Sequence, residues 1–360
     1  MILDLFAGPG GWDEGGRLTG HTGPIVGVEW DRDACRTAAA AGHWRVQADV
    51  ATYPTDPFIG KVDGLIASPP CQSFSHAGKR GGINDERGEF VWQPLRWTRA
   101  LLPRWVALEQ VPDVLPIWQI TAAALRELGY STWAGTLNAA DYGVPQTRIR
   151  AVLTARLDGT TRPPQPTHTK HAGEDLFSSG LAGWVSMAEA LGWSGDVAYR
   201  RTRGAGMVER HGDRPVTPVS EPAPTITGKS RSDVWFLGAG AASERTAGAA
   251  PRSLTDPAHT INGKGTAAWC FDRPATTVMG DPRIGRPGHK SRDKGERQFD
   301  KDSVRVTVEE AAVLQSFPRG YPWQGSKTSQ HQQVGNAVPP LLAAAILRPL
   351  LAADEGWVAA

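Results

Sequence analysis

The stretch SPPCQSFS (residues 68–75) places strong limits on the fold, because two prolines stand between a short apolar run and a cysteine. The run VDGLIA (62–67) has the length and composition of a buried strand, and Pro-Pro closes it with a stiff loop. Each proline has a fixed φ, and the residue before each proline is held extended. Cys71 is therefore expected at the carboxyl end of a buried strand, with little backbone freedom. In open α/β sheets, ligands bind at this edge.

Length and composition set broader bounds. With 360 residues the chain is long enough for more than one domain, and 40% apolar and 21% charged residues are typical of a soluble protein. The three cysteines are odd in number and widely spaced, so they form neither a metal-ligand pattern nor a disulfide framework. No signal peptide or long apolar run stands out. We therefore expect a soluble, cytoplasmic protein with no membrane contact and no bound metal.

The N-terminal segment has the pattern of a nucleoside-binding unit. The apolar run MILDLF (1–6) leads directly into the glycine-rich turn AGPGGW (7–12), and such a turn lets a ligand approach the backbone. A second apolar run ends in Glu29, where nucleoside-binding α/β units place a carboxylate on the ribose hydroxyls. Trp30 follows and can stack on a flat base, and a third run ends near Asp49, an acceptor for an exocyclic amine. A solvated strand end is the alternative for either acid alone, but Glu29, Trp30 and Asp49 in this order after the glycine turn are hard to obtain by chance.

Two later segments carry further polar groups. The apolar run WVALEQVPDV (105–114) repeats the strand-to-proline pattern and places Glu109 at its end, where it can hold or donate a proton unless it is merely an exposed strand end. Gln146, Arg148 and Arg150 alternate, so they share one face of a strand. Two neighbouring guanidiniums repel each other unless a partner lies between them. A phosphate, a base edge or a neighbouring carboxylate would serve.

Taken together, these segments resemble the DNA (cytosine-5)-methyltransferase family, of bacterial or phage type. The motifs that carry the resemblance are, in chain order, DLFAGPGGW, EW, ADV, SPPCQSFS, EQV, QTRIR, RVTVEEAAVLQSFP and QVGNAVPP. They span about 1–155 and 303–352. One motif departs from the family pattern, because the family usually has Glu-Asn-Val where this chain has EQV. Gln110 therefore replaces an asparagine that the family uses to fix local geometry.

The resemblance implies a fold and a division of the chain. The expected fold is a doubly wound, Rossmann-like α/β sheet of the S-adenosylmethionine-dependent methyltransferases, with an inserted small β-rich recognition domain. Residues 1–155 would form the first part of the catalytic domain, 156–302 the target-recognition domain, and 303–360 a C-terminal catalytic part that packs back on the first. The implied activity is methyl transfer from S-adenosylmethionine to carbon 5 of cytosine in a specific double-stranded DNA sequence, by a monomer.

The resemblance also implies roles for single residues. Cys71 would be the thiolate that attacks carbon 6 of a flipped-out cytosine, and Glu109 would hold or protonate N3. Arg150 would contact the O2 carbonyl and help hold Cys71, with Arg148 near a phosphate or the base. The cofactor-binding residues that it implies are Phe6, Ala7, Gly8, Gly10, Glu29, Trp30, Asp49, Val50, Pro70, Asn336 and Val338.

The middle segment has no family signature and is modestly basic, with 21 Lys and Arg against 17 Asp and Glu in residues 156–302. Such an imbalance suits a polyanion partner but is also common by chance. The pattern Pro-Ala-x-Thr-hydrophobic-x-Gly occurs three times, at 220–229, 255–264 and 272–281. Each copy is expected to form a turn, a short strand and a glycine turn, as β scaffolding or as a DNA contact. The residues expected to contact DNA are Gln72, Ser75, Lys79, Arg80, Lys229 and Lys264, together with basic loops at 200–214 and 282–298.

The C-terminal segment predicts two helices that return to the first part of the chain. Thr307 and Glu310 form a plausible capping box for a helix over 306–318, and a second helix begins at the Pro pair near residue 339. Two alternatives stay open on the sequence alone. One is an RNA cytosine-5 methyltransferase with the same fold, and the other is a DNA-binding relative that has lost activity.

Overall fold

The computed structural model describes residues 1–70, 90–172, 180–192, 197–200, 217–226, 234–237, 303–305 and 307–352. Cys71 and the segment that follows it up to residue 89 lie outside these residues. Most of the middle segment between 201 and 302 lies outside them as well.

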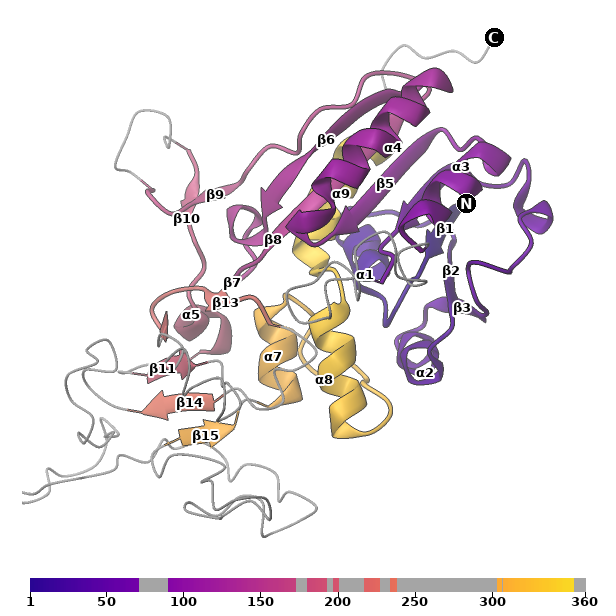
Figure 1. The fold of residues 1–360 in the computed structure, drawn as a ribbon. Helices are drawn as coiled ribbons and strands as arrows, with labels where there is room; N and C mark the ends of the chain where they lie inside the picture. The colour runs from indigo at the N-terminus through magenta and orange to yellow at the C-terminus, as the bar shows by residue number, and fades with distance from the viewer. Residues whose placement is uncertain are drawn as a thin grey trace, which may run out of the picture.

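The chain is built around a seven-stranded sheet with the order β3-β2-β1-β4-β5-β8-β6 (Figure 1). Its strands are β1 (Ile2–Leu5), β2 (Ile25–Glu29), β3 (Trp44–Gln47), β4 (Gly64–Ala67), β5 (Trp105–Gln110), β6 (Ser131–Asn138) and β8 (Ile149–Arg156). The first five run parallel, whereas β8 is antiparallel to both β5 and β6. The carboxyl ends of the five parallel strands therefore meet at one edge. The direction of strand addition reverses between β1 and β4, where doubly wound sheets bind ligands.

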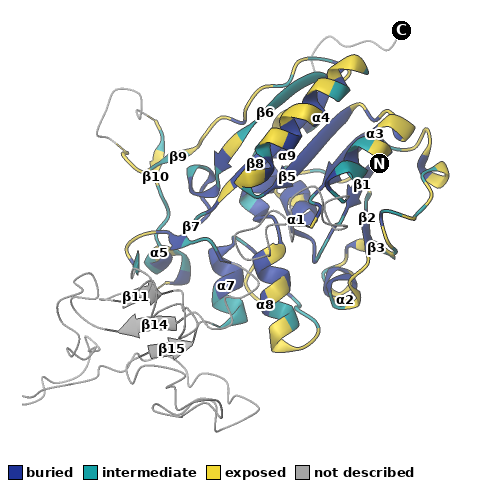
Figure 2. Ribbon diagram, in the orientation of Figure 1, coloured by how far each residue is buried: buried dark blue, intermediate teal, exposed yellow. Residues whose placement is uncertain are grey.

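Helices cover both faces of this sheet, which confirms the expected Rossmann-like α/β fold. Helices α3 (Gln93–Leu101) and α4 (Leu115–Glu127) bury Trp97 and Trp118 against one face. Helices α1 (Gly11–Leu18) and α9 (Pro340–Leu351) pack on the other face. The central strands β1, β4 and β5 are buried along their whole length (Figure 2), as the continuous apolar runs predicted.

Local sequence signals account for several boundaries. Helix α2 (Arg32–Ala40) begins after Asp31, whose carboxylate accepts a hydrogen bond from Ala34 N at 2.7 Å, so the expected N-cap is confirmed. Helix α7 (Val308–Leu314) begins with the predicted capping box. The third apolar run ends earlier than expected. Strand β3 stops at Gln47, so Asp49 lies in the turn beyond it.

Helix α1, near the N-terminus, packs against α9, the last described helix. A Cβ on Gly11 would lie 2.2 Å from Val338 O, and one on Gly15 would lie 2.5 Å from Ala343 Cβ. Glycines at these positions therefore let α1 approach the segment that leads into α9. By length and composition alone, one stretch, α8 (Lys327–Asn336) with α9, is long and apolar enough to cross a membrane. However, 67% of its most apolar window is buried inside the protein.

The middle segment contributes small sheets. Strands β12 (Thr217–Pro218), β11 (Val197–Arg200), β14 (Val234–Leu237) and β15 (Ser303–Arg305) form an antiparallel sheet, and β9 (His168–Thr169) pairs with β10 (Ala182–Gly183). Strand β13 (Ala223–Pro224), in the first copy of the repeat, pairs with β7 (Gln146–Thr147). Its neighbours Val219 and Ile226 pack with α7 and the short helix α5 (Met187–Leu191). The second and third copies lie outside the described residues.

Candidate active site

The carboxyl end of β1 continues into a glycine loop with an unusual backbone conformation. Phe6, Gly8 and Gly10 have positive φ values of 58°, 55° and 117°, a region that residues with a Cβ rarely occupy. A Cβ on Gly8 would meet nothing within 4 Å, so the backbone faces open space at this point. The loop therefore offers its peptide groups to a ligand at close range.

Glu29, at the end of β2, ties this loop to the neighbouring strand. One carboxylate oxygen accepts a hydrogen bond from Gly8 N and the other from Asp31 N, both at 2.8 Å. Burial raises the pKa of Glu29, and the two backbone amides act in the opposite direction. Each carboxylate oxygen has two lone pairs, so Glu29 can still accept from hydroxyl groups. Trp30, the next residue, is 76% exposed, which leaves its flat ring available for stacking.

The other residues expected at the cofactor have different surroundings. Asp49 is exposed and its Oδ1 accepts from Ala51 N at 2.9 Å, whereas the Val50 side chain is buried in the core. Val338 is buried beside Gly11 in α1, and Asn336, at the end of α8, is exposed. Ala7 is buried within the loop, and Pro70 is exposed as the last described residue before Cys71.

Together, the open glycine loop, the strand-end carboxylate and the exposed indole fit the nucleoside part of S-adenosylmethionine. Such a loop permits close backbone contact with a ligand, a strand-end carboxylate can accept from hydroxyl groups, and an exposed indole can stack on a flat base. In the part of the chain that the structure describes, no group of three or more His, Cys, Asp or Glu side chains is placed to hold a metal ion.

Glu109 and Arg150 form a buried ion pair at the carboxyl end of β5. Arg150 Nε lies 2.9 Å from Glu109 Oε1, and the residues are 8% and 4% exposed. The antiparallel pairing of β5 with β8 brings them together, because Glu109 stands opposite Val152. The sequence left three partners open for this arginine, and the structure selects the carboxylate.

Gln110 links the ends of β4 and β5. Its Nε2 donates to Pro69 O, two residues before Cys71, and its Oε1 accepts from Val111 N. One amide thus holds the loop that leads to Cys71 against the strand that carries Glu109. The methylene that Gln110 adds relative to asparagine is accommodated here, because both ends of the amide are used and the side chain is buried.

Arg148 has surroundings that differ from the sequence expectation. We expected it near a phosphate or the base, but its side chain is buried and donates to three backbone carbonyls. Nη1 donates to Ile226 O at 2.8 Å, and Nη2 donates to Gly335 O and Ala337 O at 3.0 and 3.1 Å. Arg148 therefore fastens the first repeat copy and the end of α8 to the QTRIR segment. A guanidinium suits this position because its five N–H groups fan out in one plane.

Comparisons with known proteins identify the family. The family model described as C-5 cytosine-specific DNA methylase matches residues 1–181 and 248–352. The type II methyltransferase M1.HphI of Haemophilus parahaemolyticus is 30% identical over 371 residues, which cover 97% of this chain and 86% of that protein. This chain belongs to the C-5 cytosine-specific DNA methylase family. It is a DNA cytosine-5-methyltransferase.

Two further proteins are similar to this chain over nearly the same length. The type II methyltransferase M.DdeI of Desulfomicrobium norvegicum is 26% identical, over 96% of this chain and 87% of that protein. The crystal structure of the Dnmt2 methyltransferase of S. pombe aligns with a TM-score of 0.57 at 16% identity, over 97% of this methyltransferase and 99% of that chain. At that identity, the structural likeness shows the shared fold alone.

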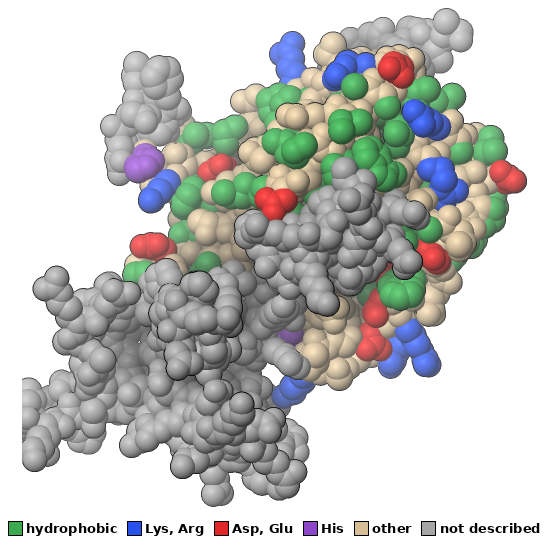
Figure 3. All heavy atoms as spheres, viewed as in Figure 1, with side chains coloured by type: hydrophobic (Ala, Val, Ile, Leu, Met, Phe, Trp, Pro, Cys, Tyr) green, Lys and Arg blue, Asp and Glu red, His purple; other side chains and the backbone are tan. Residues whose placement is uncertain are grey.

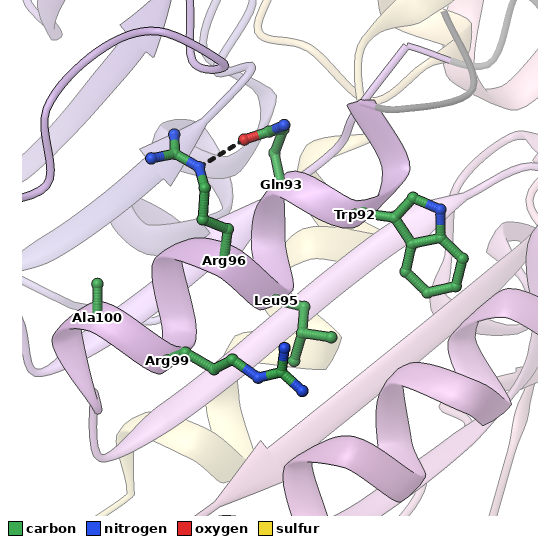
Figure 4. Close-up of a pocket in the computed structure, with 6 residues that line it drawn as sticks. All are labelled: Trp92, Gln93, Leu95, Arg96, Arg99 and Ala100. Atoms are coloured by element: carbon green, nitrogen blue, oxygen red, sulfur yellow. Dashed lines mark hydrogen bonds between the residues drawn. The ribbon is translucent and has the colours of Figure 1, made fainter. Parts of the chain in front are cut away.

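A groove on the outer face of α3 contains none of the predicted site residues. It is lined by Trp92, Gln93, Leu95, Arg96, Arg99 and Ala100. Figure 4 shows Arg96 turned away from Leu95 and Arg99 and hydrogen bonded to Gln93. Arg96 Nη2 also donates to Val50 O at 2.6 Å. Sequence reasoning missed this contact, which holds the turn after β3, because no local pattern joins residues 46 positions apart.

The residues expected to contact DNA lie outside the described part of the methyltransferase. These are Gln72, Ser75, Lys79, Arg80, Lys229 and Lys264, with the basic loops 200–214, apart from Arg200 at the end of β11, and 282–298. On the face drawn in Figure 3, the Lys and Arg side chains of the described residues are scattered. The described surface in this view therefore offers no concentrated basic patch in their place.

Removing the Gln110 amide is expected to weaken both the fold and the catalytic step. In Gln110→Ala, Pro69 O and Val111 N lose their partner, which should lower the free energy of unfolding by about 1–3 kcal/mol. The value of kcat should fall because the loop carrying Cys71 is no longer fixed to β5. Gln110→Asn, which is one methylene shorter, should lose one of the two contacts and give intermediate values. Urea denaturation and steady-state methylation assays measure the two effects, and an unchanged kcat in Gln110→Ala would contradict this role.

Replacing Arg148 with methionine should destabilise the protein strongly. The substitution leaves the carbonyls of Ile226, Gly335 and Ala337 without this donor, and we expect the free energy of unfolding to fall by about 3 kcal/mol. Denaturant unfolding followed by circular dichroism measures the change. Arg126→Met is the control. Arg126 is exposed on α4, and its one hydrogen bond to the described residues goes to Thr132 Oγ1, so its loss should change stability by about 0.5 kcal/mol or less. An equal loss of unfolding free energy in the two variants would contradict a stabilising role for the contacts of Arg148 with the three carbonyls.

Proposed function

We propose that this chain methylates carbon 5 of cytosine in a specific double-stranded DNA sequence, through a covalent bond between Cys71 and carbon 6 of a flipped-out base. The buried Glu109–Arg150 pair at the end of β5 carries the proposal. It lies beside the segment that leads into Cys71, because Gln110 connects that strand end to Pro69 O. A carboxylate and a guanidinium held together at a strand end that is tied to the segment before Cys71 suit a proposed thiolate attack on a pyrimidine ring.

The chemistry requires these groups because carbon 5 of cytosine is a poor nucleophile. Addition of the Cys71 thiolate to carbon 6 converts the ring to an enamine, whose carbon 5 can take a methyl group. Glu109 holds or protonates N3 and accepts from the exocyclic amine, and Arg150 contacts O2, so both stabilise the charge that develops. Loss of the proton from carbon 5 to water or hydroxide then allows elimination of the thiolate. A stacked base exposes neither carbon to the thiol, so the target must be flipped out.

S-adenosylmethionine, when bound, supplies the electrophilic methyl group. Phe6 to Gly10 would lie beneath it, Glu29 would accept from the ribose hydroxyls, and Trp30, Asp49 and Val50 would meet the adenine. Asn336, Val338 and Pro70 would complete the site. The open backbone at Gly8 and the exposed ring of Trp30 support this assignment.

We also infer the larger arrangement. Residues 1–155 and 303–360 would form the catalytic domain and 156–302 the recognition domain, with Lys229 and Lys264 on phosphates. The small sheet extends to Arg305, which would move the second boundary slightly. We expect a monomer that acts in the cytoplasm of a prokaryotic or phage-infected cell. The relatives M1.HphI and M.DdeI are type II methyltransferases, which favours a role in restriction–modification.

Bisulfite sequencing of DNA from cells that express the protein tests the activity. We expect protected cytosines within one short sequence, and their complete absence would count against the proposal. Duplex DNA that contains 5-fluorocytosine in that sequence tests the covalent step. Fluorine cannot leave as a proton would, so a protein–DNA adduct should persist in denaturing gels. A competition assay distinguishes a DNA methyltransferase from an RNA methyltransferase. Unlabelled duplex DNA should inhibit methylation of labelled duplex DNA, whereas transfer RNA should not.

A further inference from the structure

A row of three residues crosses the sheet beneath the glycine loop. Asp4 in β1, Gly27 in β2 and Arg45 in β3 are direct neighbours in the parallel register. A Cβ on Gly27 would lie 2.7 Å from Arg45 Nη1 and 2.9 Å from Arg45 Cδ. The arginine therefore crosses over β2 at the one position in this row that has no side chain. Its guanidinium reaches the end of β1.

All five N–H groups of this guanidinium have acceptors. Nε donates to Gly8 O at 3.1 Å and Nη2 to Ala7 O at 3.4 Å, both in the glycine loop. Nη1 donates to Trp44 O at 2.9 Å. The two terminal nitrogens also hold the Asp13 carboxylate in the first turn of α1, at 3.2 and 2.7 Å. With the side chain only 2% exposed, this bidentate contact fixes the plane of the guanidinium.

The loop needs such support because its conformation is costly. Phe6 is an aromatic residue at a positive φ, and positive φ values at Gly8 and Gly10 follow within four residues. Other contacts hold the loop from different sides. Glu29 accepts from Gly8 N at 2.8 Å, and the Tyr321 hydroxyl donates to Pro9 O at 2.6 Å. Only Arg45 holds two successive carbonyls at once among these contacts.

We propose that Arg45 is a positioning residue for the cofactor, which fixes the orientation of the Ala7 and Gly8 peptide groups and so sets the affinity for S-adenosylmethionine. This inference rests on the proposed function, in which the same loop lies beneath the cofactor. A loop held in its binding conformation before the ligand arrives does not have to be ordered on binding, so affinity is gained. Arg45 does not contact the cytosine site at the end of β5, so the chemical step should not depend on it.

The charges around Arg45 decide which substitution is informative. Among the described residues, neither carboxyl oxygen of Asp4 has a hydrogen-bond partner. Burial, followed by the nearby Asp13 carboxylate, raises the pKa of Asp4 well above the usual range. A neutral residue at position 45 would leave Asp4 and Asp13 without their buried cation and would endanger folding. Arg45→Lys keeps the charge near Asp13. However, its single ammonium cannot serve Asp13 and both loop carbonyls in one plane.

Calorimetric titration of S-adenosylmethionine into the Arg45→Lys variant without DNA tests the proposal. We expect the Kd to rise about tenfold, which corresponds to the loss of charge-assisted contacts to the loop. In methylation assays the KM for S-adenosylmethionine should rise in parallel. The kcat at saturating cofactor should stay within about threefold of wild type, and the KM for DNA should not change. A purely structural role would lower kcat and thermal stability without a selective change in cofactor affinity.

Arg17→Lys is the matched control. Arg17 is also an arginine beside α1, paired with Glu14 at 2.7 Å and donating to Ala41 O, but it does not contact the loop carbonyls. The Kd of the Arg17→Lys variant for S-adenosylmethionine should equal that of the wild type. If Arg45→Lys does not fold, Asp13→Asn, which loosens the anchor of Arg45 without altering it, should raise the Kd in the same direction. An unchanged Kd in a folded variant overturns the inference alone, whereas absence of binding by the wild type overturns the proposed function.

Discussion

Replacing Cys71 with alanine is expected to abolish methyl transfer while S-adenosylmethionine binding persists. Without the sulfur no bond to carbon 6 forms, and carbon 5 stays too poor a nucleophile to take the methyl group. The glycine loop follows β1 and Glu29 ends β2. Both strands lie on one side of β4, the strand that leads to Cys71, and Glu109 on β5 lies on the opposite side. The binding site should therefore survive. Single-turnover methylation with radiolabelled cofactor and calorimetric titration measure the two properties separately.

Cys35→Ala is the control for this prediction. Cys35 lies on α2, is buried, and contacts Glu29 O through its sulfur at 3.4 Å. Burial raises the pKa of its thiol to about 11, so at neutral pH it stays protonated and is a weak nucleophile. Only Cys71→Ala should lose the adduct with 5-fluorocytosine DNA. An adduct that still forms in Cys71→Ala, or an adduct that is lost only in Cys35→Ala, would show that Cys71 is not the nucleophile.

The elements predicted well from the sequence are those whose signals are local. The run MILDLF predicted β1 to within a residue at each end, and Asp31 and Thr307 marked helix starts through their own capping contacts. Strand β3 was less well predicted. Its exposed residues Trp44 and Gln47 do not form an apolar run, and the turn at Asp49 is held partly by Arg96 from α3.

The polar contacts of the site were predicted less well, because their partners are far away in the chain. Arg148 alternates with Arg150 in the sequence, yet one binds carbonyls 78 to 189 positions later and the other a carboxylate on the adjacent strand. Their chemistry is identical and only the tertiary fold distinguishes them. The sequence does not indicate a role for Arg45, since a single arginine in a strand usually faces solvent. The glycine opposite it, Gly27, becomes meaningful only once the register is known.

Glu109→Gln should lower kcat by about 10²–10⁴-fold, the usual contribution of a positioned general acid or base. Glutamine keeps the shape of the side chain and an oxygen for Arg150 Nε, but it carries no charge and no transferable proton. N3 of the attacked ring then loses its proton donor or anionic partner while the thiolate adds. The cofactor Kd should be unchanged, because Glu109 lies at the end of β5, away from the glycine loop. Rapid-quench methylation at saturating cofactor and DNA measures the effect.

The ion pair also predicts a difference in stability that separates chemistry from folding. Arg150 is buried against Glu109, so Glu109→Gln leaves a buried cation without its anion and should reduce thermal stability. The double variant Glu109→Gln, Arg150→Met removes both charges. It should recover much of that stability, since a buried pair replaced by neutral groups often costs little, but it should recover no activity. Activity regained together with stability would mean that Glu109 only holds the fold. Activity that stays low in the restabilised double variant would place Glu109 and Arg150 in the chemical step.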